Sequence, residues 1–241
     1  MRAFFLAVLI SFPAATLVAQ DVADRPAFEV ASVKPHDRSQ LARPESSDPA
    51  RISGTSTMTN LIMVAYSVKP YQILGPDWLL LEAYDIEAKY PAGKGRQDLP
   101  ELFQDLLNKR FGFTSHWEVR DQKVYALVVG NSGPKLTPSA ADAKPRKSAS
   151  TSGHIDFTAQ LLSALADYLT NCCFDKPVVD ETNIQFRVDI SLDLVSDKSD
   201  SVDKSSAATE SLIEHGLKLK PSTRQVRYLI IDAINKAPSP N

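Results

Sequence analysis

The chain has 241 residues, of which 43% are hydrophobic and 23% charged, with 27 basic residues against 29 acidic ones. This composition is typical of a folded protein with one large hydrophobic core or two smaller ones. Because the charge is nearly balanced and no basic run occurs, the sequence argues against nucleic-acid binding.

The first twenty residues differ in kind from the rest. Arg2 precedes an apolar run from Ala3 to Ile10, and small residues lead from there to Ala19 and the polar Gln20. This order is typical of a secretory signal peptide, with cleavage near Ala19 or Gln20. No later segment is apolar enough over a sufficient length to cross a bilayer. We therefore expect residues 1–20 to be a signal peptide and the mature chain to be secreted or periplasmic.

The next eighty residues combine short strand patterns with one helix pattern. The strands are predicted at 28–33, 51–57, 71–74 and 84–88. A helix that carries Leu61, Ile62 and Ala65 on one face is expected to follow a threonine cap at Thr57 or Thr59.

The clearest unit of the sequence lies between residues 98 and 131. Apolar residues at three-and-four spacing predict a helix over 99–111, with Asp98 and Glu101 as a capping box and Gly112 as its left-handed end. A half-buried strand is expected at 113–119, a polar turn at 120–123 and a more central strand at 124–129.

The second half begins after residues 135–153, which are rich in Ala, Ser, Pro and Lys and are predicted to be a flexible linker. Beyond the linker we expect strands at 155–157, 177–180, 186–192, 217–219 and 226–232, helices at 161–169 and 207–215, and a turn at 221–224.

The order of these elements repeats that of the first half. Asp85-Ile86 matches Asp189-Ile190, and Phe111-Gly112-Phe113 matches His215-Gly216-Leu217. We predict an α+β fold of two similar helix and antiparallel-sheet subdomains, 21–134 and 154–241, that arose by internal duplication. Two unrelated α+β halves are the alternative.

Both cysteines of the chain are adjacent, Cys172 and Cys173, at the end of a predicted helix. Neighbouring cysteines seldom bridge each other because the ring strains the intervening peptide, so we expect two semi-buried thiols packed as small hydrophobes. Intermolecular pairing or capture of a soft metal in an oxidising compartment are the alternatives.

Several phrases of the sequence together resemble one protein family. They are FEVASVKPH, MTNLIMVAYSVKPYQILGPDWL, YDIEAKY, LLNKRFGFTSHWEVRDQKVYALVV and KPVVDET followed by FRVDISLDL. They are similar to a large paralogous family of exported acidobacterial proteins of the Solibacter type, known only as a domain of unknown function. The resemblance implies a bacterial, extracytoplasmic module, sometimes attached to membrane-embedded sensor metallopeptidases, and brings no catalytic residues. The chain departs from the family pattern at Asn183-Ile184-Gln185, where relatives carry glycines.

The sequence matches none of the common catalytic templates. The four histidines, His36, His116, His154 and His215, lack the spacing of a zinc site, and neither a serine elbow nor a phosphate-binding glycine loop occurs. We therefore predict no catalytic, metal-binding or cofactor-binding residues. Carboxylates that share a strand face, Asp85 with Glu87 and Asp189 with Asp193, leave an extracellular hydrolase as an alternative.

The region from Tyr71 to Leu81 is the predicted partner-binding surface. Trp78 follows a Gly-Pro-Asp turn, which favours an exposed aromatic contact, and Tyr71 and Leu81 flank it. We interpret the protein as an exported, non-catalytic module that binds a protein or a cell-envelope component. A small-ligand sensor domain, with an apolar pocket between the halves, is the third option.

Overall fold

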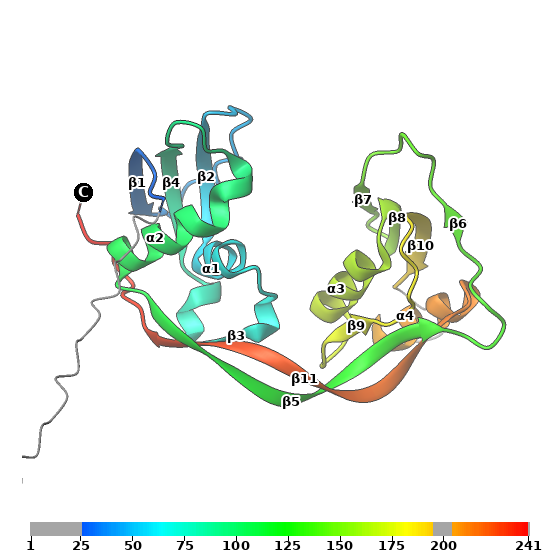
Figure 1. Ribbon diagram of the computed structural model, residues 1–241. Helices are drawn as coiled ribbons and strands as arrows, with labels where there is room; N and C mark the ends of the chain where they lie inside the picture. Colours follow the sequence, from blue (N-terminus) through cyan, green and yellow to red (C-terminus); the bar gives the residue numbers. More distant parts are fainter. Residues whose placement is uncertain (1–25, 195–203, 241) are drawn as a thin grey trace, which may run out of the picture. The chain divides into compact units, whose positions relative to one another are not determined.

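The computed structural model describes residues 26–194 and 204–240, and the predicted signal peptide lies outside them. Within these residues, helices and three separate sheets form the predicted α+β fold (Figure 1). Contacts divide the chain into two units. Among the described residues, the first contains 26–67, 77–113 and 234–240, and the second contains 68–76, 114–194 and 204–233.

The first unit is a three-stranded antiparallel sheet packed against two helices. Its strands, in the order β1-β4-β2, are β1 (Val30–Pro35), β4 (Ala83–Lys89) and β2 (Arg51–Thr57). Its helices are α1 (Met58–Tyr66) and α2 (Leu99–Phe111), with 3-10 turns η2 (Asp77–Leu80) and η3 (Arg96–Asp98). Tyr84, Ile86 and Ala88 are buried on one face of β4, which covers the strand predicted at 84–88.

Both helix patterns of the first unit are confirmed, but one cap is not. The Thr57 hydroxyl accepts a hydrogen bond from Asn60 N at 3.3 Å, and Gly112 ends α2 at φ 59°. The Asp98 carboxylate instead accepts from Gly95 N at 2.9 Å and does not cap α2. The predicted capping box is therefore wrong, because a 3-10 turn precedes the helix and Asp98 closes that turn.

The second unit contains two four-stranded sheets. One has the order β3-β11-β5-β9, formed by β3 (Ile73–Leu74), β11 (Leu217–Ala233), β5 (Thr114–Val129) and β9 (Val178–Asp180). The other has the order β6-β10-β8-β7, formed by β6 (Thr137–Pro138), β10 (Val188–Asp193), β8 (His154–Gln160) and β7 (Arg146–Ala149). The helices are α3 (Leu162–Cys172) and α4 (Lys204–Glu214), and a 3-10 turn, η1 (Pro70–Gln72), precedes β3.

The turns predicted at 120–123 and 221–224 are wrong. β5 and β11 run side by side as one long antiparallel ribbon, in which Arg120 pairs with Val226 and Lys123 with Thr223 (Figure 1). Apart from its outer ends, where β3 and β9 add to it, the ribbon has no further strand beside it among the described residues. Polar residues on both faces of a two-stranded ribbon stay in water, so its middle has the composition of a turn.

The linker predicted at 135–153 contributes two strands to a sheet. β6 pairs with β10, and β7 pairs with β8, with Lys147 opposite Phe157. All six residues of these two edge strands are exposed, so they carry no apolar alternation for sequence analysis to detect. The two units also differ from the predicted subdomains 21–134 and 154–241, because β5 joins the second unit and the C-terminal segment joins the first.

The order of elements repeats along the chain. β2-α1-β3-β4-α2-β5 is followed by β8-α3-β9-β10-α4-β11. The strand registers agree as well: Gly54 lies opposite Ile86 as Phe157 lies opposite Ile190, and β3 runs parallel to β11 as β9 runs parallel to β5. Buried positions follow the same spacing in the leading helices, with Met58, Leu61, Ile62 and Ala65 in α1 and Leu162, Leu165, Ala166 and Leu169 in α3.

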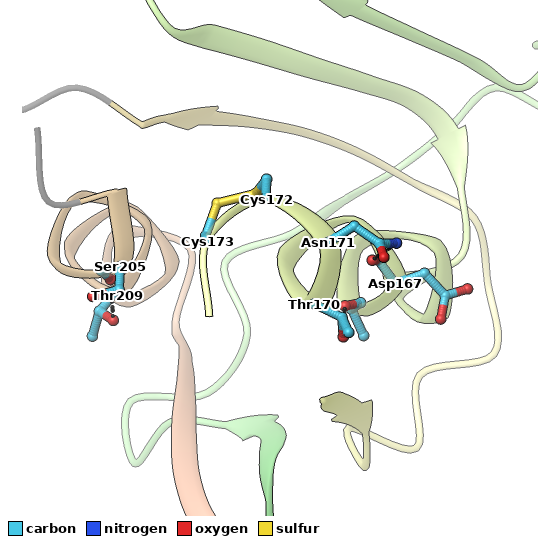
Figure 2. The surroundings of a disulfide bond; sticks show 8 residues. Asp167, Thr170, Asn171, Cys172, Cys173, Ser205 and Thr209 are labelled. Atoms are coloured by element: carbon cyan, nitrogen blue, oxygen red, sulfur yellow. Dashed lines mark hydrogen bonds between the residues drawn. A yellow bond between two sulfur atoms is a disulfide. The ribbon is translucent and has the colours of Figure 1, made fainter. Parts of the chain in front are cut away.

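Cys172 and Cys173 form a disulfide with each other at the end of α3 (Figure 2). The expectation of two free thiols is therefore wrong. Cys172 is the last helical residue and Cys173 leaves the helical conformation, at φ −133° and ψ −23°, so their side chains are not held on the separate faces that a helix interior imposes. Both residues pack against the core of the second unit.

Candidate functional site

The predicted surface residues fall in different units. Trp78 and Leu81 belong to the first unit, within and just after η2, whereas Tyr71 lies in η1 of the second. Tyr71 is half-buried, and its pKa is raised, mainly by burial and then by the Asp167 carboxylate. Trp78 and Leu81 thus belong to one unit and Tyr71 to the other.

Three successive leucines lie within and just after η2, and they differ in their exposure to solvent. Leu79 is buried, whereas Leu80 and Leu81 are 67% and 69% exposed. Trp78 beside them is half-buried. We call Trp78, Leu80 and Leu81 the η2 surface. Two large aliphatic side chains side by side in water cost free energy that a partner would recover on binding.

Hydrogen bonds and ion pairs hold the backbone of the η2 surface. Leu81 N and Glu82 N both donate to Trp78 O, at 3.0 and 2.9 Å. The Glu82 carboxylate pairs with Lys236 Nζ and Arg38 Nη2, each at 2.9 Å, and the Lys236 bond is the main reason why the pKa of Glu82 is lowered. The exposed leucines are therefore presented from a fixed backbone with charged groups around it.

The first unit also contains a cavity of about 300 Å³ between its sheet and its helices. Its walls are mainly apolar side chains from β2, β4, α1 and α2, namely Ile52, Leu61, Val64, Ile86, Leu99 and Phe103. Its polar lining includes Glu45, Ser56 and Asn60. This volume lies at the lower end of the range for small-molecule sites.

Gly54 lies in the wall of this cavity. It pairs with Ile86 of β4, which also lines the cavity. A Cβ at Gly54 would also approach Glu45 Cα and Pro44 O to 3.2 Å, so glycine permits the segment 43–46 to lie against β2. In that segment Ser46 N donates to Ser53 O and Thr55 N donates to Arg43 O.

The first unit also contains a buried hydroxyl without a hydrogen-bond partner among the described residues. It belongs to Tyr90, whose ring contacts Phe28, and Phe28 in turn contacts Phe103 of the wall. Burial raises the pKa of Tyr90, and the nearby charges have smaller effects, with Arg96 lowering this pKa and Glu45 raising it. This part of the first unit therefore leaves a polar group unsatisfied, which is uncommon in a protein interior.

Two of the carboxylates singled out for acid–base chemistry, Asp85 and Asp189, have a lowered pKa and are held in ionised form. A Thr55 hydroxyl bond is the first reason why the pKa of Asp85 is lowered, and a Ser139 bond is the first for Asp189. Asp193 pairs with His154, and Glu87 lies 3.8 Å from Arg51. Every described Asp or Glu with a clear shift has a lowered pKa, the opposite of what a general acid requires.

Each of the four histidines has its own partners. His36 contacts Asp85, His215 contacts Ser191 O, and His116 and His154 each lie between two carboxylates. Within residues 26–194 and 204–240, no group of three or more His, Cys, Asp or Glu is arranged to hold a metal ion. No helix in this part of the chain has the length and apolarity that a membrane span requires.

A more open depression of about 550 Å³ lies beside α3 in the second unit. Its lining is mixed, with Lys147, Phe157, Gln160, Asp167, Tyr168, Asn171 and Cys172 among its residues. Lys147 Nζ lies 4.8 Å from the centre of the Tyr168 ring, and Tyr168 meets Phe157 edge-on. Figure 2 shows the Cys172–Cys173 bond next to Asn171 at the end of the same helix.

Sequence reasoning missed Leu80 and the cavity residues. The run Leu79-Leu80-Leu81 contained the signal for Leu80, because a single tight turn cannot bury three successive leucines on one side. An isolated glycine inside a strand pattern, Gly54, indicates a close backbone approach and pointed to the cavity. Asn60 carried no signal of its own.

Comparison with known proteins gives one match. The model of a family described as a protein of unknown function (DUF3738) matches residues 59–234. Neither the curated proteins nor the solved structures contain a significant match to the chain.

Proposed function

The chain belongs to the DUF3738 family, and we propose that it is an exported, non-catalytic module that binds a protein of the cell envelope through the η2 surface. The observation that carries this proposal is the pair of exposed leucines, Leu80 and Leu81, on a backbone fixed by hydrogen bonds and by the Glu82 ion pairs. An apolar centre with a charged rim has the composition of a protein–protein interface.

Two observations support export. Residues 1–20 have the composition of a signal peptide. The disulfide between Cys172 and Cys173 suits an oxidising compartment, since cytosolic reductants keep most thiols reduced. Secretion or a periplasmic location is therefore part of the proposal.

We also infer that the two halves arose by duplication. The repeated order of elements, the matching registers at Gly54 and Phe157 and the matching parallel strands β3 and β9 support this inference. The repeat extends into the segment predicted as a linker: Lys34 pairs with Asp85 as Thr137 pairs with Asp189. The proposed repeat boundary thus moves from the 135–153 region to a point before β6.

The experiment that tests the proposed function is capture from envelope extract with the mature chain as bait. The double variant Leu80→Ser, Leu81→Ser should lose the partner, because it removes the apolar centre of the surface. Leu41→Ser is the matched control, since Leu41 is 93% exposed and also lies in the first unit. Both variants should keep the wild-type circular dichroism spectrum. A partner that the double variant still captures, or no reproducible partner at all, would contradict the proposal.

A further inference from the structure

We propose that the cavity of the first unit binds a small, uncharged, mainly apolar molecule that carries a hydroxyl or carbonyl group. This site is separate from the η2 surface: none of Trp78, Leu80 and Leu81 lines the cavity. It also differs from the sensor pocket expected between the halves, because all its lining residues belong to one unit.

The lining of this cavity differs from that of the depression beside α3 in the second unit. Gly54 and Phe157 hold equivalent places, each opposite an isoleucine of the neighbouring strand, Ile86 or Ile190. Val64 and Tyr168 are likewise the seventh residues of α1 and α3. The second unit therefore lines its depression with two aromatic rings at the places where the first unit has a glycine and a valine. The glycine and the valine leave the first unit with a smaller, mainly apolar pocket, whose walls a small ligand would cover.

The charge of the lining selects an uncharged ligand. Among the described residues that line the cavity, Glu45 alone is ionisable, and its Oε1 already accepts from Arg96 Nη1 at 2.7 Å. A charged group that entered the cavity would lose its water and meet no free counter-charge among these residues. The apolar walls, by contrast, gain from covering any hydrocarbon.

Two polar side chains specify the hydroxyl or carbonyl group. Ser56 and Asn60 line the cavity, and within the described residues neither side chain makes a hydrogen bond. A serine hydroxyl and an asparagine amide can each donate and accept, so together they suit an alcohol or a carbonyl oxygen. The site thus combines apolar walls, which would contact the hydrocarbon part of the ligand, with two polar side chains for its hydroxyl or carbonyl group, as small-molecule sites commonly do.

The test is a titration of the mature chain with three probes that share one hydrocarbon body: 1-hexanol, hexanoate and hexylammonium. The readout is the δ1-methyl NMR signals of Ile52 and Ile86, with those of Ile155 and Ile190 in the second unit as internal references. We expect a saturable shift with 1-hexanol only at the first pair, with Kd of about 1 mM. The charged probes should bind at least about tenfold more weakly.

Variants connect the binding to the cavity. Val64→Phe introduces a ring at the position of Tyr168 and should abolish the shift without loss of fold, because Val64 is 41% exposed. Val30→Phe is the matched control, as Val30 is also exposed in the first unit and does not line the cavity. Ser56→Ala and Asn60→Ala should each weaken 1-hexanol binding about two- to tenfold. Equal binding of all three probes, unchanged binding to Val64→Phe, or the absence of a saturable shift would each overturn the proposal.

Discussion

The Asp85 carboxylate joins three segments of the first unit. Its Oδ1 accepts from Thr55 Oγ1 at 2.6 Å, lies 3.0 Å from His36 Nδ1 and is 3.5 Å from Arg43 Nε. The equivalent Asp189 accepts from Ser139 Oγ and Ala159 N. Both aspartates therefore hold neighbouring segments against their strand by hydrogen bonds. This structural role explains the acidic residue at each position, and no catalytic role is needed.

His154 lies between two carboxylates on the surface of the second unit. Its Nδ1 is 2.6 Å from Asp193 Oδ1, and its Nε2 is 3.1 Å from Asp156 Oδ1. The Asp193 bond is the first reason why the pKa of His154 is raised, while a Ser191 bond is the first reason why the pKa of Asp156 is lowered. Protonated His154 thus holds the two acids, one on its own strand β8 and one on β10.

We predict that the stability provided by His154 depends on pH. Because folding raises the pKa of His154, its protonated ring stabilises the fold fully at pH values below the unfolded-state pKa of 6.5. This stabilisation is lost as pH rises through the folded-state pKa. Asp156 has the opposite pH dependence because folding lowers its pKa. Its carboxylate stabilises the fold at pH values above the unfolded-state pKa of 3.8, and this stabilisation is lost as pH falls through the folded-state pKa. The loss of unfolding free energy in His154→Gln should therefore be largest at about pH 5 to 6 and should shrink in alkaline solution.

Urea unfolding across this pH range measures the effect. In an Asp193→Asn background the first partner of His154 is removed, so His154→Gln should have a smaller and flatter effect. A His154→Gln effect that stays constant from pH 5 to 9, or that grows with pH, would show that the carboxylates do not control this histidine.

At the scale of secondary structure, regular patterns were predictable and exposed strands were not. The α1 and α2 patterns were confirmed because each helix buries one stripe, such as Met58, Leu61 and Ile62 in α1. β7 and the middle of the β5–β11 ribbon were not predicted, because few of their side chains are buried and their sequences therefore show no alternation of apolar and polar residues. Their pairing is set by partners far away in sequence, which local patterns do not report.

The same reasoning explains which parts of the candidate sites could be predicted. Trp78 and Leu81 were named because a turn sequence precedes them, and a turn is a local feature. The cavity depends on residues of β2, β4, α1 and α2 meeting in space, for example Gly54 with Ile86. The disulfide depends on where α3 ends, and helix ends are the least certain part of any pattern.

The turn between α4 and β11 should be intolerant of any side chain at Gly216. Gly216 adopts φ +71°, and a Cβ there would lie 2.1 Å from Gly133 O and 3.0 Å from Lys135 N. Both of these are backbone atoms, which cannot rotate away. We predict that Gly216→Ala lowers the free energy of unfolding by about 3 kcal/mol or more, measured by urea denaturation.

Gly133→Ala is the matched control for this prediction. Gly133 also has a positive φ, of +78°, and belongs to the same unit, but a Cβ there meets nothing within 4 Å. It should therefore carry only the conformational cost, about 1 kcal/mol. Equal losses in the two variants would mean that the contact with the 133–135 backbone is unimportant.

At the scale of the whole molecule, the chain leaves the first unit at β5 and returns to it after β11. Residues 234 onward lie on the first unit, where Asn235 N donates to Phe111 O and Ser239 N donates to Arg110 O, each at 2.7 Å. Tyr84 is fully buried, and its hydroxyl donates to Lys236 O at 2.7 Å. Burial raises the pKa of Tyr84 to about 12, so the hydroxyl remains a donor at any ordinary pH.

Deletion of residues 234–241 should therefore destabilise the first unit selectively. The deletion leaves the buried Tyr84 hydroxyl without its acceptor, at a cost of about 1–3 kcal/mol, and removes Lys236 from Glu82. Hydrogen exchange followed by mass spectrometry should show faster exchange in peptides of β4 and α2 and little change in those of β8 and α3. In a Tyr84→Phe background, where no hydroxyl needs an acceptor, the same deletion should cost less. Equal acceleration in both units, or the same cost with and without the hydroxyl, would show that the C-terminal segment does not stabilise the first unit through Tyr84.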